Sequence, residues 1–371
     1  MRMVFSKKTW FFTLLVMIIA GAVCWFVFGR SDSIYKAKYE RESVQVRFDI
    51  EIFDEIIGNY WQKVEEKDLA ELFRLSLAKA ASTTELTLAS QDRDGIAKKL
   101  WEIIKAAPED GRNELAINTG IIVLANLAPQ GRNGLLSDKE ETAFRDNVNN
   151  INPETGLAEP TLDSNKPSAD TLYLNLSKIS ANTLQEVVTL FEKQSKLDMS
   201  ENLIIDLRDN AGGTLDFARY FFSMFIGPNQ YVYDYFHQGE LKPERTPAFN
   251  KLELLSDVKN IAVLTDENTQ STSELLASIF KRFRLAKIVG TQTKGWGTVE
   301  NTFPLETNLG DGNKYSLLLV HSLTLREDGE PIEGRGVEPD INLKNTNWRQ
   351  QLSNTFPSSA FVDDLVKVLS K

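Results

Sequence analysis

Apolar and polar positions follow three successive patterns along the chain. The first is an uncharged run over residues 10–28, WFFTLLVMIIAGAVCWFVF. As a helix at about 1.5 Å per residue it nearly spans a bilayer core of roughly 30 Å, so residues 1–30 are predicted to form a membrane anchor with one transmembrane helix. A cleaved signal peptide is the alternative, because AGA at 20–22 resembles a cleavage site. Basic residues flank both sides of the run, so they do not fix its orientation.

The second pattern is helical and covers residues 43–151. Apolar residues recur there near a 3.6-residue period, as in Phe48, Ile52 and Ile56. Two sequences with the form of a capping box, DLAE at 68–71 and SDKE at 137–140, predict helix starts. We therefore expect a helical N-terminal region. Residues 152–170, rich in Pro, Asn, Ser and Asp, are predicted to form a linker and a domain boundary.

The third pattern, over residues 171–345, alternates strand-like and helix-like segments. The strand-like segments are 171–179, 202–209, 260–266 and 286–292, and the helix-like segments are 183–194, 214–225 and 273–283. Such alternation predicts an α/β (α+β) core with a mostly parallel sheet and crossover helices, followed by a C-terminal helical segment at 346–371. In this architecture functional sites lie at the carboxyl ends of strands.

Composition narrows the classes of function. The net charge of −10 and the pI near 5.0 argue against nucleic acid as a partner. The single cysteine, Cys24, rules out an intrachain disulfide and a cysteine-based zinc site, and two histidines make a multi-histidine metal site unfavourable. We therefore expect neither a metal nor a cofactor.

Two segments at predicted strand ends carry candidate chemistry. In DLRDNAGGTLD, Gly212 and Gly213 either form a tight turn or present backbone N–H groups to a developing oxyanion. In STSE at 271–274, Ser271 either caps the following helix or acts as a nucleophile, with the N–H of Thr272 beside it. A serine that caps a helix does not easily attack a carbonyl, so the two interpretations compete.

Four ordered segments resemble the core of the C-terminal processing (tail-specific) serine peptidases. They are NLIIDLRDNAGGTLD (202–216), IAVLTDENTQSTSELLASIF (261–280), IVGTQTKGWGTVENTFPL (288–305) and DGEPIEGRGVEPDI (328–341). LAPQGRNGLLSDKEE at 127–141 is similar to the end of that family's helical part, and the resemblance covers roughly residues 45–345. It implies a hydrolase that cleaves polypeptides through an acyl-enzyme on Ser271, outside the cytoplasm. By the same resemblance, Thr272 with Gly212 or Gly213 forms the oxyanion hole.

The position of the general base departs from that family. In its Ser/Lys branch a lysine lies 25 residues after the serine, and Trp296 stands there in this chain. The glutamine that supports the lysine is replaced by Glu300. Lys294 is the first candidate base, because residues two apart in an extended segment face the same side. It would need burial to lower its pKa, and Glu300 would oppose that change by stabilising the ammonium.

Two alternatives to Lys294 remain open. The family's tricorn-like branch uses a histidine and a glutamate; Glu333 matches the glutamate, but the histidine position falls near Asn175. His237 or His321 could serve only if folding brought one of them to Ser271. Otherwise no base is present, and the chain is an inactive pseudopeptidase that binds extended peptides.

A further departure concerns substrate selection. Family members commonly carry a PDZ domain between the helical part and the core, whereas only the 152–170 segment fills that interval here. Recognition of a free carboxyl end is therefore in doubt. The sequence as a whole predicts a PDZ-less, single-pass membrane serine peptidase with an extracytoplasmic catalytic domain that acts on unstructured polypeptides.

Overall fold

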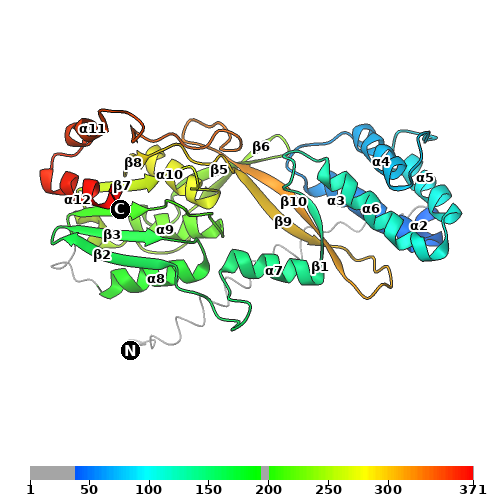
Figure 1. Ribbon diagram of the computed structural model, residues 1–371, viewed down its shortest axis with the longest axis horizontal. Coiled ribbons are helices and arrows are strands. Elements are labelled where there is room, and N and C mark those ends of the chain that lie inside the picture. Colours follow the sequence, from blue (N-terminus) through cyan, green and yellow to red (C-terminus); the bar gives the residue numbers. More distant parts are fainter. Residues whose placement is uncertain (1–37, 194–199, 371) are drawn as a thin grey trace, which may run out of the picture.

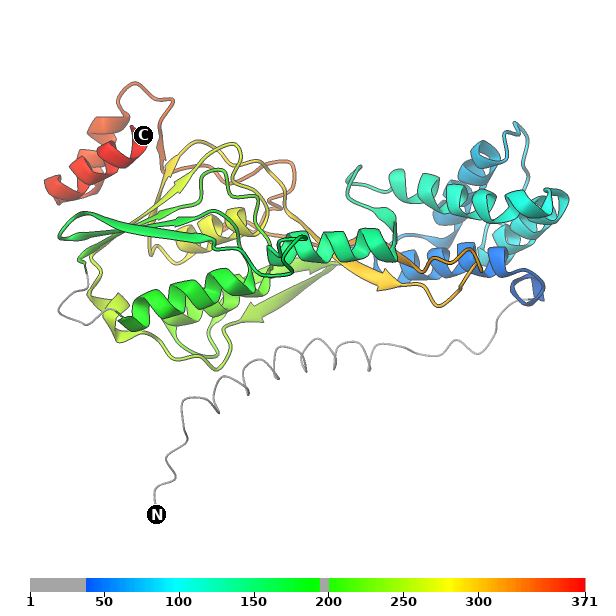
Figure 2. The same ribbon diagram turned by 60° about the horizontal axis from the view of Figure 1, so that its bottom comes forward.

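A computed structural model describes residues 38–193 and 200–370. The molecule is elongated, with a helical region at one end and an α/β core at the other (Figures 1 and 2). Long antiparallel strands run between these two ends (Figure 1). The site described below lies in the α/β core, and one of its arginines comes from the helical side.

Apolar faces at helical spacing build the helical region. Its helices are α2 (Lys38–Glu42), α3 (Val44–Asn59), α4 (Glu66–Ala80), α5 (Arg93–Ala106), the short 3-10 helix η1 (Glu109–Gly111) and α6 (Arg112–Ala125). Buried residues of α3 to α6, Phe48, Ile52 and Phe73 among them, form one apolar core. The spacing that predicted a helical region is therefore the spacing of the buried face.

The two predicted capping boxes have different outcomes. Ser137 caps α7 (Asp138–Asn149), accepting from the N–H of Glu140, whose side chain accepts from the N–H of Ser137. The prediction at 68–71 is wrong, because α4 begins at Glu66 and the N–H of Asp68 donates to the carbonyl oxygen of Glu65. A capping-box sequence therefore does not by itself place a helix start in this chain.

A six-stranded sheet forms the α/β core. Its strands lie in the order β11 (Ile341–Asn342), β8 (Lys287–Gly290), β7 (Asn260–Thr265), β4 (Asn202–Asp206), β3 (Thr171–Leu176) and β2 (Leu162–Ser168). All neighbours are parallel except β2, which pairs antiparallel with β3 at the edge. Helices α8 (Ala181–Lys193), α9 (Asp216–Ile226) and α10 (Thr272–Arg282) share one apolar core with one face of the sheet, and α11 (Trp348–Thr355) and α12 (Ser359–Leu369) share another with the opposite face.

A second sheet corrects the expectation of one mostly parallel sheet. It is antiparallel throughout, in the order β1 (Gly134–Ser137), β10 (Tyr315–Thr324), β5 (Tyr231–His237) and β6 (Glu240–Arg245), with β9 (Thr298–Pro304) also paired to β10. The 3-10 helix η2 (Glu253–Asp257) follows β6. Pairs such as Gly134 with Leu318 are far apart in sequence, so local periodicity could not predict them. The fold is thus a mixed α/β fold with two sheets.

The membrane prediction also needs correction. The run at 10–28 lies outside the described residues. Within residues 38–193 and 200–370, no helix is long and apolar enough to cross a bilayer. The expected single-pass membrane localisation is therefore withdrawn. The predicted division into domains remains a prediction, although residues 162–168 of the expected linker form β2.

Candidate active site

Ser271 lies in the turn between β7 and α10. Its backbone has φ +56° and ψ −125°, a strained conformation for a residue with a side chain. Ser271 and Glu274 form a capping box, in which the Glu274 side chain accepts from the N–H of Ser271 at 2.9 Å; within the described residues the Ser271 hydroxyl itself accepts no hydrogen bond. The N–H of Glu274 donates instead to the carbonyl oxygen of Ser271 at 2.8 Å. The hydroxyl is therefore not used as a helix cap, which removes the main objection to a nucleophilic role.

Gly212 and Gly213 follow β4 and lie directly against this turn. A side chain on Gly212 would place its Cβ 2.8 Å from the Cβ of Ser271, and φ is +82°, so the approach requires glycine. The N–H of Gly212 donates to Asn210 Oδ1 at 2.8 Å and is therefore occupied. Within the described parts of the chain, the N–H groups of Gly213 and Thr272 have no acceptor. These two, rather than Gly212, are the pair that could hold an oxyanion.

Hydrogen bonds fix this pair of N–H groups relative to each other. The Thr272 hydroxyl donates to the carbonyl oxygen of Gly213 at 2.9 Å. On the other side of the glycines, the N–H of Ile179 donates to the carbonyl oxygen of Gly212 at 3.0 Å, and the carbonyl oxygen of Ile179 accepts from the N–H of Thr214 at 3.1 Å. The glycine loop is thus bonded to the β3–α8 turn on one side and to the start of α10 on the other.

The buried carboxylate of Glu274 joins Ser271 to a second loop. It accepts from the N–H of Ser271 (2.9 Å), from the N–H groups of Gly295 and Trp296 (2.7 Å each) and from the Thr293 hydroxyl (2.5 Å). Burial raises the pKa of Glu274, and these hydrogen bonds partly oppose that rise. The sequence marked Glu274 only as a capping partner, so its role in joining the two loops was missed.

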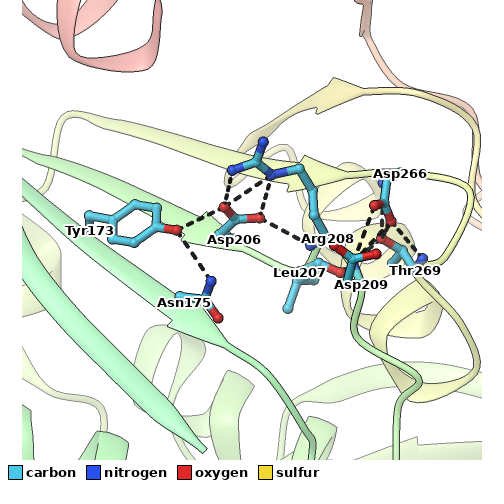
Figure 3. Close-up of polar contacts among 8 residues, drawn as sticks. All are labelled: Tyr173, Asn175, Asp206, Leu207, Arg208, Asp209, Asp266 and Thr269. Atoms are coloured by element: carbon cyan, nitrogen blue, oxygen red, sulfur yellow. Dashed lines mark hydrogen bonds and ion pairs between the residues drawn. The ribbon is translucent and has the colours of Figure 1, made fainter. Parts of the chain in front are cut away.

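A polar network at the ends of β3 and β4 supports the loop that leads to the glycines (Figure 3). The buried Asp206 carboxylate pairs with Arg208 at 2.6 Å and accepts from the Tyr173 hydroxyl at 2.9 Å. The Asn175 amide donates to the same hydroxyl at 3.3 Å. Asn175 stands near the position at which the tricorn-like branch has its histidine, and here it binds Tyr173.

A second part of the network connects this loop with the one before Ser271 (Figure 3). Asp266 accepts from the N–H groups of Asp209 at 3.1 Å and Thr269 at 2.8 Å. The Thr269 hydroxyl donates to the carbonyl oxygen of Leu207 at 2.8 Å. The N–H of Gln270 donates to the carbonyl oxygen of Asn210 at 2.9 Å. The glycines and Ser271 are therefore held together by contacts between the ends of β4 and β7.

Trp296, at the position of the expected lysine, is covered by an arginine. The guanidinium carbon of Arg132 lies 3.3 Å from the Trp296 ring centroid. Arg132 also donates to Thr298 Oγ1 (2.8 Å) and forms an ion pair with Glu333 (3.2 Å). Glu300 accepts from the Thr298 hydroxyl (2.5 Å) and from the indole N–H of Trp296 (3.3 Å).

The predicted Glu333 is held in place by this cluster. It accepts from the N–H of Gly297 at 2.8 Å in addition to its contact with Arg132. Burial raises the pKa of Glu333; the Gly297 hydrogen bond and the Arg132 charge lower it, and Glu300 raises it further. Glu300 and Glu333 thus lie near each other, but both are engaged with the residues around Trp296.

Lys294 is close to Ser271 through its backbone, whereas its side chain is exposed. Its N–H donates to the carbonyl oxygen of Thr269, two residues before Ser271, at 3.0 Å. The side chain lies in solvent, so the burial that a lysine base requires is missing in this conformation. The backbone of Lys294 therefore lies near Ser271 while its side chain is exposed, and its role as the base remains a prediction.

A second lysine, Lys178, was not predicted from the sequence as part of the site. It directly precedes Ile179, the residue bonded to the glycine loop, and its ammonium donates to Asn147 Oδ1 at 3.2 Å. Lys178 is half-buried, and this burial lowers its pKa. Its place near the end of the predicted strand-like segment 171–179 was the one signal in the sequence.

The two histidines lie together in the antiparallel sheet. Their rings stack with centroids 4.2 Å apart, and His237 Nδ1 contacts the carbonyl oxygen of His321 at 2.6 Å. Burial, together with the neighbouring His237, lowers the pKa of His321 to about 4. Both rings belong to β5 and β10 rather than to the turn that carries Ser271. The described residues also include no group of three or more His, Cys, Asp or Glu side chains that could hold a metal ion.

Comparisons with known proteins identify the class. Residues 170–343 match the model of peptidase family S41. A Staphylococcus epidermidis protein named "Probable CtpA-like serine protease" is 29% identical over 186 residues, which is 50% of this chain and 36% of that protein. The carboxy-terminal-processing protease of Bartonella bacilliformis is 31% identical over 172 residues, 46% of this chain and 38% of its own.

The curated relatives are longer than the region that matches. Bacillus subtilis carboxy-terminal processing protease CtpB, for example, is 28% identical over 176 residues, or 47% of this chain and 34% of CtpB. The chain thus spans little more than a third of the length of these relatives.

Two solved structures share the fold across most of the chain. A lipoprotein from Streptococcus agalactiae aligns with a TM-score of 0.51 and 18% identity, covering 87% of this chain and 98% of its own. The photosystem II D1 C-terminal processing protease aligns with a TM-score of 0.52 and 13% identity, covering 81% of this chain and 93% of its own. The match of residues 170–343 to the peptidase family S41 model confirms the resemblance found in the sequence.

Proposed function

We propose that this protein is a serine peptidase that cleaves extended or unstructured polypeptides through an acyl-enzyme on Ser271. The observation that carries the proposal is the turn at Ser271. Its hydroxyl accepts no hydrogen bond from the helix, and the N–H groups of Gly213 and Thr272, which have no acceptor among the described residues, are held near each other. The match of residues 170–343 to peptidase family S41 supports the same chemistry.

The geometry supports a two-step acyl transfer. Ser271 Oγ attacks the peptide carbonyl carbon, and the negative oxygen accepts hydrogen bonds from the two N–H groups. The hydroxyl proton passes to a base and then to the leaving amine. Water hydrolyses the acyl-enzyme by the same route and regenerates Ser271. Removal of one donor from such a hole typically costs about 100- to 1,000-fold in rate.

Two lysines are candidates for the base. Lys294 is the candidate that the sequence supplies, and it would have to leave solvent and fold back toward Ser271 when a substrate covers it. Lys178 is already half-buried with a lowered pKa, and it flanks the residue bonded to the glycine loop. Glu333 and Glu300 accept hydrogen bonds from the loop around Trp296 and do not serve as bases.

Labelling with a fluorophosphonate probe tests the nucleophile. The full-length chain and Ser271→Ala are incubated with fluorophosphonate-rhodamine from pH 6 to 10, and in parallel with fluorescein-labelled casein. We expect both labelling and casein cleavage in the wild type only. Labelling of the alanine variant at the wild-type rate would contradict the proposal.

Methionine variants of the two lysines separate the candidates for the base. Lys178→Met and Lys294→Met each remove one ammonium and keep an apolar stem of similar length. The variant that lacks the base should lose about 100-fold or more in labelling rate, and the other should stay within about twofold. If both variants are labelled at the wild-type rate, neither lysine is the base.

The second candidate function is a pseudopeptidase that binds extended peptides without cleaving them. It is favoured by the stacked Trp296 at the lysine position and by the exposure of Lys294. In this case wild type and Ser271→Ala would bind fluorescein-labelled casein equally, and neither would be labelled by the probe nor cleave the casein.

A further inference from the structure

Arg132 connects the helical side of the molecule with the site. It lies in the segment between α6 and β1, far in sequence from every residue that it contacts in the core. Its side chain is 14% exposed and stacks on Trp296, donates to Thr298 and pairs with Glu333. Each of these three contacts goes to the loop around Trp296 or to the glutamate that binds the same loop. The guanidinium thus binds one loop through a stacking contact, a hydrogen bond and an ion pair.

This loop is itself bonded to the nucleophile turn. One oxygen of Glu274, Oε2, accepts both from the N–H of Trp296 (2.7 Å) and from the N–H of Ser271 (2.9 Å). A displacement of Trp296 would therefore move the acceptor that fixes the backbone of Ser271. The path from Arg132 to Ser271 contains only Trp296 and Glu274.

Charge explains why the loop depends on the arginine. Glu333 and Glu300 lie close enough for each to influence the other, and Arg132 is the cation paired with Glu333. Without it, two partly buried carboxylates would face each other with one of them unpaired, an unfavourable arrangement in a low-dielectric environment. A lysine would restore the charge, but not the planar stacking or the forked donors.

We propose that Arg132 is a positioning residue, through which the helical side of the molecule holds the Trp296 loop and so sets the reactivity of Ser271. The proposal rests on the proposed function, since it presupposes that Ser271 is acylated. It gives a role to the tryptophan that replaces the expected lysine: Trp296 supplies the surface on which Arg132 docks. Acylation is then coupled to the docking of the segment between α6 and β1 on the core.

The test compares three arginine variants of the full-length chain. Arg132→Ala and Arg132→Lys probe the contact, and Arg145→Ala is the matched control, because Arg145 lies on neighbouring α7, is itself exposed and forms an ion pair with Glu141. The second-order rate constant for labelling by fluorophosphonate-rhodamine is measured with the thermal midpoint of each variant. We expect a loss of about tenfold or more for Arg132→Ala, a smaller loss for Arg132→Lys and less than twofold for Arg145→Ala.

Kinetics on fluorescein-labelled casein distinguish positioning from a purely structural role. Arg132 acts on the turn of Ser271, so Arg132→Lys should lower kcat and leave KM within about twofold. Trp296→Phe, which keeps an aromatic surface, should retain more activity than Trp296→Ala. If Arg132→Ala does not fold, Arg132→Lys and Trp296→Phe provide the comparison at their own thermal midpoints.

The possible outcomes separate the two proposals. If the wild type is not labelled at any pH, the proposed function fails before Arg132 is considered. If the wild type is labelled and folded Arg132→Ala reacts at the same rate, the role of Arg132 is refuted while the nucleophile stands. Losses of activity that follow only the loss of folded protein in all variants would also overturn the positioning role.

Discussion

The two sides of the site around Ser271 are built differently. On the oxyanion side, the glycine loop lies against the start of α10, and the N–H of Gly212 is occupied by Asn210, whereas that of Gly213 has no acceptor among the described residues. On the base side, an arginine, a tryptophan and two carboxylates occupy the region where a lysine and a glutamine were expected. Glu274 is bonded to both sides.

This difference indicates which part of the site is constrained by backbone geometry. The oxyanion side is made of N–H groups and of glycines that no other residue can replace without a clash. The base side is made of side chains, which can change identity while the loop keeps its path. Variants at Gly213, Glu274 and His321 show whether the two sides contribute separately to the reactivity of Ser271.

The largest effect is expected for Gly213→Ala, on the oxyanion side. The added Cβ would lie 1.7 Å from the carbonyl oxygen of Ile179, and φ is +148°, so the backbone must move. We expect the labelling rate of Ser271 to fall by about 100-fold, because the N–H of residue 213 is displaced from the oxyanion. The rate is measured with fluorophosphonate-rhodamine and corrected for the folded fraction.

Gly310→Ala is the matched control for this change. Gly310, between β9 and β10, also has a positive φ, +75°, but a Cβ there would meet no atom within 4 Å. It should therefore lower stability by about 1 kcal/mol through backbone strain, while the labelling rate stays within about twofold. A comparable loss of labelling in both variants would mean that strain alone, and not the displaced N–H, explains the effect.

A smaller effect is expected for Glu274→Gln, which alters the connection between the two sides. The carboxylate accepts hydrogen bonds from three N–H groups and one hydroxyl, whereas an amide nitrogen would place N–H groups against some of these donors. We expect the free energy of unfolding to fall by about 1–3 kcal/mol and the labelling rate by about tenfold. Chemical denaturation and labelling measure the two quantities.

Glu267→Gln serves as the control for this variant. Glu267 is exposed in the same β7–α10 connection and binds Thr291 by a single hydrogen bond. Both quantities should be nearly unchanged. If Glu274→Gln loses stability but keeps the wild-type labelling rate, Glu274 supports the fold without positioning Ser271.

Much of the core could be predicted from local sequence. Strands β3, β4 and β7 and helices α8 to α10 follow the predicted alternation, since each has its apolar residues at the period of its own element. The antiparallel sheet was missed because its pairings join residues distant in sequence, as Gly134 and Leu318 show. Periodicity within one segment contains no information on such a partner.

In the site, too, features encoded in local sequence could be predicted, whereas contacts between distant residues could not. Ser271, Thr272 and the glycines could be predicted as candidates, because a strand-to-helix turn places them in a fixed relation within short segments. Arg132 was not found, since nothing in its own segment indicates that it stacks on a tryptophan far along the chain. Lys294 was predicted by its spacing from Ser271, but spacing could not show that its side chain lies in solvent.

The smallest effect on the site is expected at the histidines, which would be the base if the tricorn-like arrangement applied. Because they lie in the antiparallel sheet, His321→Phe should leave the labelling rate within about twofold. It should instead change how the free energy of unfolding depends on pH in the acidic range. The folded protein holds the pKa of His321 at about 4, against an ordinary value of 6.5, so the unfolded chain binds a proton that the folded chain does not.

The sign of this effect follows from linkage. His321 stabilises the fold fully above pH 6.5, and this contribution is lost as the pH falls from 6.5 to about 4. Between these values the wild type should lose about 3 kcal/mol of unfolding free energy that His321→Phe does not lose, since each pKa unit corresponds to about 1.4 kcal/mol. Urea denaturation at intervals across this range measures the difference. A loss of labelling at neutral pH in folded His321→Phe would instead place the histidine pair in the catalytic machinery and extend the base side of the site into the antiparallel sheet.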